Sequence, residues 1–250
     1  MSRRTLISAG AVIAVLTAIA ATIVPAAHGF APAKAAVINA APGWPDLPVS
    51  DFSSEITNPW FPLKVGSSWV SKGVKDGRPT VDTYTVTGQT KTIEGVKASV
   101  IRDVLTVHGK AIEATWDWYA QDKQGNVWYF GENTKELNAQ GKVTSTAGTW
   151  QAGVKDARPG IYMPAHPATG KGGYQEYLAG VALDRFTMVK YGAAIKVPYG
   201  SFRNALMSQE TTALEPGVLD HKFYVKGIGQ VAEVSVKGPV EKSFLVTRHK

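Results

Sequence analysis

The chain has 250 residues, with 25 Gly, 14 Pro, no Cys and a formal net charge of +7. With 44% hydrophobic and 19% charged residues, this composition argues against wholesale disorder and fits one globular domain, alone or preceded by a targeting segment. The absence of Cys excludes disulfides, thiol catalysis, iron–sulfur clusters, cysteine-based zinc sites and a lipidated N-terminal cysteine.

The first 29 residues have the layout of an export signal. Arg3 and Arg4 precede an apolar run over residues 6–24, and small residues then suit cleavage after Gly29 or Ala35. An uncleaved membrane anchor is the alternative, because the run approaches the length of a spanning helix. The paired arginines fit a twin-arginine signal and a general secretory signal equally well. We therefore expect a secreted or extracytoplasmic protein.

The organisation after the signal changes near residue 52. Residues 30–51 are rich in Ala and Pro, which predicts an extended tether. Over residues 52–250, about ten short β-branched and aromatic runs alternate with Gly-containing turns, which predicts one all-β domain. We expect a curved antiparallel sheet that closes into a barrel or half-barrel. The Gly- and Pro-rich residues 147–169 are expected to form a long ordered loop, a lid across one end of the sheet.

A hairpin over residues 112–132 is the most informative segment. Polar and aromatic residues alternate along its first strand, and residues 122–125 form the turn. If Gln121 pairs with Asn126, one face carries the following carboxylates and rings: Glu113, Asp117, Tyr119, Trp128, Phe130 and Glu132. A slip of one residue would bring in Tyr129 and move Glu132 to the opposite face.

Two interpretations of this acidic face remain open from the sequence. It is either a solvated outer face, with Trp116 and Trp118 packed inward, or the lining of a barrel lumen that holds a ligand. On the second interpretation, the expected ligand-binding residues come from the hairpin and from the segment around residues 160–177: Glu113, Trp116, Trp118, Tyr119, Trp128, Tyr129, Phe130, Tyr162, Met163 and Glu176.

Acid–base catalysis is the alternative use of the same residues. Asp117 and Glu132 would pair diagonally across the hairpin, and His166 could supply a third acid–base group. The histidines show no metal-ligand spacing, so no metal is predicted, and no cofactor can be assigned. The body of the chain has no Lys/Arg-rich block, which argues against nucleic-acid binding, although a mildly cationic protein could associate weakly with anionic envelope polymers.

Three segments of the chain resemble a loose group of uncharacterised exported bacterial proteins with a lipocalin-like, curved antiparallel β-sheet. These segments are residues 58–66, the hairpin over residues 117–132 and residues 223–231. The resemblance implies a fold and carries no assigned activity. Members of the group often have a lipid anchor, and this chain departs from them because it has no Cys.

The sequence therefore favours an exported, noncatalytic β-barrel that binds a small apolar or amphipathic ligand. The alternatives are an extracellular hydrolase or isomerase that uses carboxylates and a histidine, and an envelope-associated structural protein with a filled barrel. An Asp117 side chain that points into the barrel would favour the ligand-binding protein or the enzyme, and one that points to solvent would favour the structural protein.

Overall fold

The computed structural model of the protein describes residues 36–250, which belong to one compact unit. The export signal predicted for the first 29 residues, and both expected cleavage positions, lie outside the described residues. Within residues 36–250, the chain has no helix with the length and hydropathy needed to cross a membrane.

Strands make up nearly all of the regular structure in the described residues, which contain 18 of them and one turn of 3-10 helix at Val49–Asp51. In chain order the strands are β1 (Val37–Ile38), β2 (Leu47–Pro48), β3 (Phe52–Ser53), β4 (Ser68–Lys75), β5 (Arg78–Ile93), β6 (Val96–Val107), β7 (Lys110–Asp122), β8 (Val127–Leu137), β9 (Val143–Ser145), β10 (Trp150–Gln151), β11 (Arg158–Met163), β12 (Gly172–Tyr174), β13 (Glu176–Tyr177), β14 (Asp184–Val197), β15 (Gly200–Thr212), β16 (Leu219–Val225), β17 (Gly229–Lys237) and β18 (Glu241–His249).

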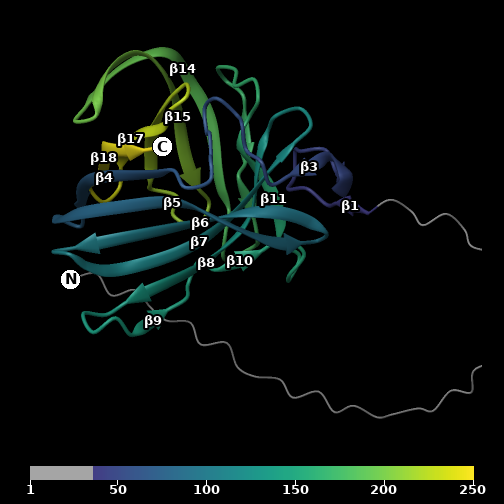
Figure 1. Ribbon diagram of the computed structural model, residues 1–250, viewed down its shortest axis with the longest axis horizontal. Helices are drawn as coiled ribbons and strands as arrows, with labels where there is room; N and C mark the ends of the chain where they lie inside the picture. The colour runs from purple at the N-terminus through teal and green to yellow at the C-terminus, as the bar shows by residue number, and fades with distance from the viewer. Residues whose placement is uncertain (1–35) are drawn as a thin grey trace, which may run out of the picture. The chain divides into compact units, whose positions relative to one another are not determined.

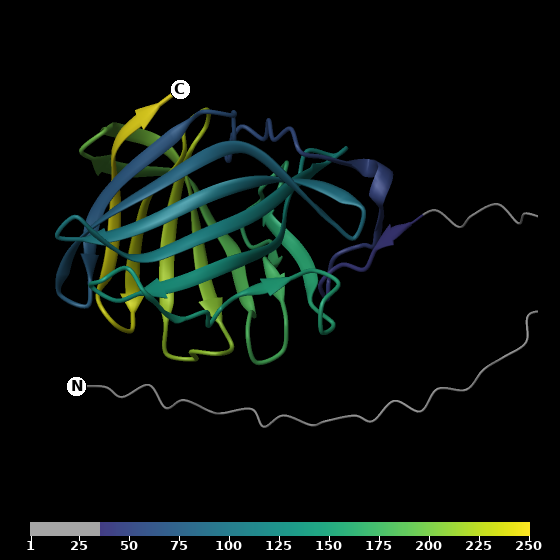
Figure 2. The ribbon, with the colours of Figure 1, turned by 60° about the horizontal axis from the view of Figure 1, so that its bottom comes forward.

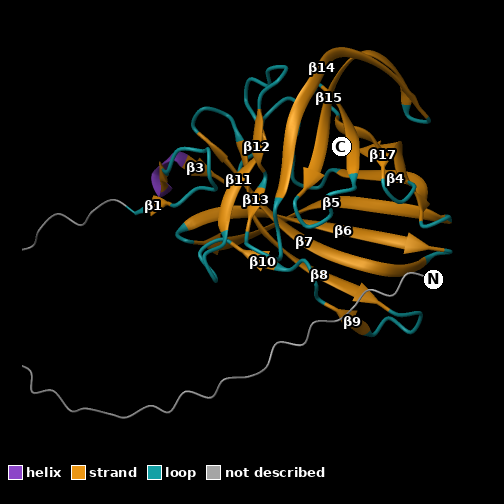
Figure 3. Cartoon of the chain, turned by 180° about the vertical axis from the view of Figure 1, so that it is seen from behind, coloured by secondary structure: helices purple, strands orange, loops and turns teal. Residues whose placement is uncertain are grey.

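The main sheet is antiparallel and runs through 13 strands in the order β12-β14-β15-β16-β17-β18-β4-β5-β6-β7-β8-β11-β13 (Figure 1, Figure 3). The short strands β3, β9 and β10 attach to β7 and β8. Most neighbours in the sheet follow each other in the chain, as expected where tight Gly-containing turns join β-branched runs. The prediction of an all-β antiparallel barrel is confirmed, with more strands than the ten or so that the sequence indicated.

One short segment joins the two ends of this sheet. β12 pairs with β14 at one end, and β13 pairs with β11 at the other. Between them, the backbone N–H of Gln175 donates to the Asp184 carbonyl at 2.8 Å, and the Gly160 N–H donates to the Gln175 carbonyl at 3.1 Å. Residues 172–177 therefore form the seam of the barrel, with Gln175 at its centre.

Two walls of the barrel face each other across its interior. In Figure 2, strands β5 to β8 cross in front of β14 to β18. Because side chains alternate between the faces of a strand, every second residue of each wall points into the enclosed space. The other face of β7 and β8 is covered by the N-terminal segment, where Phe52 makes edge contacts with Trp128 and Phe130 at ring-centroid distances of 5.8 and 5.4 Å.

The described part of the predicted tether is packed onto the barrel, which corrects that prediction. Ile38 and Ala41 are fully buried. The Ala41 N–H donates to the Pro159 carbonyl at 2.8 Å, and the Trp44 indole N–H donates to the Tyr174 carbonyl at 2.7 Å. The prolines keep this segment extended, but its apolar side chains gain about 25 cal/mol for each Å² that they bury.

The lid predicted for residues 147–169 is also corrected, because the segment is part of the sheet. It contains β10 and β11, and β11 pairs with both β8 and β13. Trp150, Ile161 and Met163 are buried. Gly160 fits here because a Cβ atom at this position would lie 2.1 Å from the Tyr174 carbonyl oxygen, so the glycine permits a close approach of strands rather than a loop.

Candidate functional site

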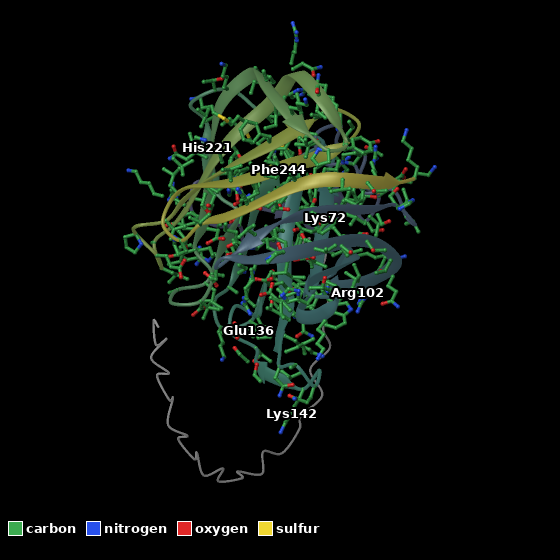
Figure 4. All side chains as sticks on the ribbon, turned by 90° about the vertical axis from the view of Figure 1, so that its left-hand side faces the viewer. Lys72, Arg102, Glu136, Lys142, His221 and Phe244 are labelled. Carbon is green, nitrogen blue, oxygen red and sulfur yellow. The ribbon has the colours of Figure 1, made fainter. Side chains whose placement is uncertain are left out.

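The barrel encloses a cavity of about 360 Å³ whose lining is strongly acidic. Among residues 36–250, ten Asp and Glu residues line it, but only three Lys and Arg residues do. The acids are Asp82, Asp103, Glu113, Asp117, Glu132, Glu176, Asp184, Glu210, Glu233 and Glu241, and the bases are Lys75, Lys222 and Lys242. By contrast, Lys72, Arg102 and Lys142 are exposed on the outside of the molecule (Figure 4).

Strand β7 turns its acids inward and its tryptophans outward. Asp117 and Tyr119 line the cavity and are 6% and 3% exposed. On the other face, Lys91 Nζ lies 3.3 Å from the centroid of the Trp118 ring, and Lys135 Nζ lies 4.9 Å from that of Trp116. Lysine stems thus shield these rings from water, and the acidic face of the hairpin is not a solvated outer face.

The predicted register of the hairpin is wrong by one residue near the turn. Gln121 pairs with Val127 rather than with Asn126, and Asp117 lies directly opposite Glu132. The register shifts between Trp118 and Tyr119, and Gly131 has a φ of 133° there. This is a β-bulge, which places an extra residue in β8 and changes the direction of the side chains beyond it.

The bulge decides which β8 side chains reach the cavity. Tyr129 and Glu132 both line it, although they are an odd number of residues apart. Trp128 and Phe130, predicted on the acidic face, instead pack outside against Phe52. The one-residue register error near the turn therefore placed these two rings on the wrong face, and the bulge beyond them returns Glu132 to the predicted one.

Replacing Gly131 with Ala should lower the free energy of unfolding by about 2 kcal/mol or more. An added Cβ would lie 2.4 Å from the Trp150 carbonyl oxygen, at a φ that side-chain-bearing residues rarely adopt. Urea denaturation measures the effect. The matched control is Gly217→Ala, because Gly217 has no neighbouring atom within 4 Å of an added Cβ. Equal stabilities of the two variants would contradict the assigned bulge.

Asp117 and Glu132 form an adjacent carboxyl pair at the centre of the β7–β8 wall. The Tyr129 hydroxyl donates to Asp117 Oδ1 at 2.6 Å, and the Thr134 hydroxyl donates to Glu132 Oε2 at 2.8 Å. Burial raises the pKa of Asp117 to about 7, although the hydrogen bond from Tyr129 lowers it. Burial and the nearby Asp117 charge raise the pKa of Glu132 to about 8. Near neutral pH, this pair therefore retains protons.

Two further cavity acids have raised pKa values: Asp103 in β6, on the same wall as the pair, and Glu176 in β13, at the seam. Burial, followed by the charge of Asp82 and a hydrogen bond with it, raises the pKa of Asp103 well above its ordinary value. Burial and the charges of Asp184 and Glu132 likewise raise the pKa of Glu176. Each of these shifts means that ionising the carboxyl inside the barrel costs free energy.

On the opposite wall of the barrel, Lys222 is paired with two carboxylates. Lys222 Nζ lies 2.7 Å from Glu210 Oε2 and 3.8 Å from Glu233 Oε1. Burial lowers the pKa of Lys222, but the charges of Glu210 and Glu233 outweigh that effect and raise it well above its ordinary value. This lysine therefore stays charged and is already engaged by protein carboxylates.

Aromatic rings form the apolar part of the lining. Phe61 lies 5.4 Å from Tyr119 and 4.7 Å from Tyr162 between ring centroids, and Tyr119 stacks on Tyr129 at 4.6 Å. Tyr84 extends the cluster toward Trp69, at 6.0 Å. All of these residues line the cavity, so its acids face a wall of rings with several phenolic hydroxyls.

The structure brings together some of the predicted site residues and separates others. Glu113, Asp117, Tyr119, Tyr129, Glu132, Tyr162 and Glu176 line the cavity, whereas Trp116, Trp118, Trp128, Phe130 and Met163 do not. His166 is exposed and lines a separate surface pocket with Tyr191 and Lys226, so it is not assembled with Asp117 and Glu132. No group of three or more Asp, Glu or His side chains among residues 36–250 is arranged to hold a metal ion.

Several cavity residues were missed by sequence reasoning: Asp82, Asp103, Gln175, Asp184, Glu210, Lys222 and Glu233. The signal that could have found them is a polar residue at alternate positions within otherwise β-branched or aromatic runs. Asp82 and Tyr84 in β5 have this spacing, and both line the cavity. Alternation identifies a face of a strand, but not which strand lies across the lumen.

Two of the segments that carried the family resemblance have a structural role. Gln121 Oε1 accepts hydrogen bonds from the N–H groups of Thr57 and Asn58 at 2.9 and 2.8 Å. The Asn58 side-chain amide donates to the Gly125 carbonyl at 2.9 Å, and the Trp128 indole N–H donates to Asp122 Oδ2 at 2.7 Å. These bonds attach the N-terminal segment to the tip of the β7–β8 hairpin and fix its turn.

Comparison with known proteins adds little to this description. No family model matches the chain, and no curated protein matches it. Among solved structures, the chain is similar to a protein of Bacteroides fragilis NCTC 9343 that is named as exported and of YmcC-like fold. The two are 15% identical with a TM-score of 0.45, and the match covers 76% of this chain and 99% of that protein. A second solved structure, a protein of Parabacteroides distasonis ATCC 8503 named as a lipoprotein, is 12% identical with a TM-score of 0.42. The match covers 77% of this chain and 99% of that protein.

Proposed function

We propose that the protein is exported and binds a small amphipathic molecule inside its barrel. The export part rests on the basic start, the apolar run and the small residues of the first 35 positions. The binding part rests on one observation, the cavity of about 360 Å³ whose lining combines carboxyl groups with a cluster of aromatic rings. Ligand cavities in proteins commonly have about this volume and this mixture of apolar wall and a few polar groups.

An amphipathic ligand suits this lining better than a purely apolar one. A hydrocarbon would leave Asp117, Glu132 and Glu176 buried without replacing their lost hydration, which costs free energy. A molecule with both a polar and an apolar part can satisfy these groups and also contact Tyr119 and Tyr162. The sequence also allowed a structural protein whose barrel is filled with side chains. A cavity of about 360 Å³ supports ligand binding over that alternative.

Native mass spectrometry of the exported protein tests this function. We expect a small-molecule mass increment that is lost on denaturation. The matched variant is Leu105→Trp, which adds volume at a half-buried position of the cavity lining. This variant should fold, as judged by its circular dichroism, and should lack the increment. Recovery of the wild-type protein as bare polypeptide, or an increment unchanged in the variant, would contradict binding in the barrel.

Acid–base catalysis is a second candidate, favoured by the adjacency and raised pKa values of Asp117 and Glu132. Carboxyls whose pKa values lie near neutrality can donate and accept protons at physiological pH. This version of the enzyme hypothesis does not use His166, which lies in another pocket. Loss of turnover with intact binding in Asp117→Asn/Glu132→Gln would favour the enzyme over the binding protein.

A further inference from the structure

The acids of the cavity are not balanced by protein cations. Of the three lysines in the lining, Lys222 is engaged by Glu210 and Glu233, Lys75 lies 3.6 Å from Glu241, and Lys242 is exposed. None of the ion pairs between described residues includes Asp117, Glu132 or Glu176. Buried carboxylates are normally paired with a cation or hydrogen-bonded on all sides. Once Asp117 and Glu132 lose their protons, which they do at a pH near or above their raised pKa values, this part of the lining is therefore complementary to a positive charge.

Gln175 provides a second, independent observation. It lines the cavity at the barrel seam, is 3% exposed, and its side-chain nitrogen has no hydrogen-bond acceptor. Leaving a buried amide N–H unpaired costs about 1–3 kcal/mol. A ligand that presents a hydroxyl or carbonyl oxygen to this nitrogen would recover that free energy. Charge balance plays no part in this observation.

The aromatic cluster favours an organic cation over a metal ion. The rings of Tyr119, Tyr129 and Tyr162 lie beside the unbalanced carboxyls, and ring faces attract ammonium groups. The carboxyls come from strands β5, β6, β7, β8 and β13 and do not converge into a metal-binding group within residues 36–250. An extended molecule can meet separated acids and rings at the same time.

We propose that the molecule bound in the barrel is an organic ammonium that also carries a hydrogen-bond-accepting oxygen and an aromatic or apolar body. This inference rests on the proposed function and narrows its ligand class. The ammonium group would lie against Asp117 and Glu132, the apolar body against the tyrosine cluster, and the oxygen within reach of the Gln175 amide.

Three probes of matched size separate the charge from the shape of the ligand. They are phenylalaninol (ammonium and hydroxyl), 3-phenylpropane-1,2-diol (neutral) and 3-phenyllactate (anionic). Isothermal titration calorimetry of the purified protein at pH 8 should show phenylalaninol binding about tenfold or more tightly than the diol, because a charge-assisted hydrogen bond is stronger than a neutral one. The phenyllactate should bind more weakly than the diol.

Two double variants show where the charge preference arises. Asp117→Asn/Glu132→Gln should reduce the affinity for phenylalaninol about tenfold and bring it close to that of the diol. The control, Glu55→Gln/Glu215→Gln, removes the same formal charge at two exposed positions that do not line the cavity, and should bind as the wild type does.

The outcomes distinguish this inference from the function on which it rests. If the diol or the phenyllactate binds as tightly as phenylalaninol, the ammonium inference is overturned while binding in the barrel stands. If none of the probes binds at millimolar concentration, both are overturned. An equal loss of phenylalaninol affinity in the two double variants would likewise overturn the inference, because the preference would then come from overall charge.

Discussion

Replacing Asp117 and Glu132 together with Asn and Gln should make the protein more stable at pH 8 and reduce the dependence of its stability on pH. Both carboxyls have a pKa in the folded protein above the ordinary value, chiefly because of burial. Between the ordinary value near pH 4 and the raised value near pH 7 or 8, the folded state therefore binds more protons than the unfolded state.

The sign of the effect follows from this proton balance. When the folded state holds the extra protons, the free energy of unfolding decreases as the pH rises. The wild-type protein should thus lose stability between pH 5 and pH 8. Each pKa unit of difference corresponds to about 1.4 kcal/mol, so raised pKa values of about 7 and about 8 correspond to a loss of several kcal/mol over this pH range. The amide variant cannot ionise and should not show this part of the loss.

Urea denaturation at pH 5 and pH 8 measures the difference. In the variant, the free energy of unfolding should still decrease with rising pH, but less steeply, because burial also raises the pKa values of Glu176 and Glu233. The control pair Glu55→Gln/Glu215→Gln should keep the wild-type slope, since both side chains are exposed. A wild-type stability that increases from pH 5 to pH 8, or an unchanged slope in the Asp117/Glu132 variant, would contradict the buried carboxyl pair.

Replacing Gln175 with Leu should separate stability from binding. The substitution removes a buried nitrogen that has no acceptor and keeps a side chain of similar size, so the free energy of unfolding should rise by about 1–2 kcal/mol. The affinity for phenylalaninol should fall about tenfold, because the hydroxyl loses its donor. Thermal denaturation and calorimetric titration measure the two effects.

Gln209→Leu is the matched control for this prediction. Gln209 is half-buried in β15 and alternates with Glu210, so it lies on the face away from the cavity. The control should leave the affinity for phenylalaninol unchanged. A loss of stability in Gln175→Leu without any change in affinity would assign Gln175 to the seam alone.

The sequence predicted the fold class and part of the cavity lining for identifiable physical reasons. Recurrent β-branched runs and Gly-containing turns indicated an antiparallel barrel. The alternation of side chains along the strand of residues 112–121 correctly placed Glu113, Asp117 and Tyr119 on one face, which lines the cavity. The error came at the turn, where Gln121 pairs with Val127 and not with Asn126, and the bulge at Gly131 then returns Glu132 to the predicted face. Alternation along the strands reveals neither the length of the turn nor the extra residue of the bulge.

The remainder of the site depended on contacts between distant strands. Asp82, Glu176 and Glu210 come together only because the sheet curves until its ends meet at residues 172–177. Alternation within a strand cannot show this closure. Residues 147–169 were interpreted as a lid because Gly and Pro usually mark loops, yet Gly160 is there to let two strands approach closely.

The raised pKa values of the buried cavity acids have a consequence for how other molecules encounter this protein. Long-range attraction depends on the net charge, and a buried carboxyl that keeps its proton near neutral pH, as Asp117, Glu132 and Glu176 tend to do, contributes no negative charge to it. Near neutral pH, the protein is therefore more cationic than the formal net charge of +7 indicates, because that value counts every acid as ionised. Retention on a cation-exchange resin or on an anionic polysaccharide will reflect this larger positive charge, which an isoelectric point calculated from composition with ordinary pKa values does not include.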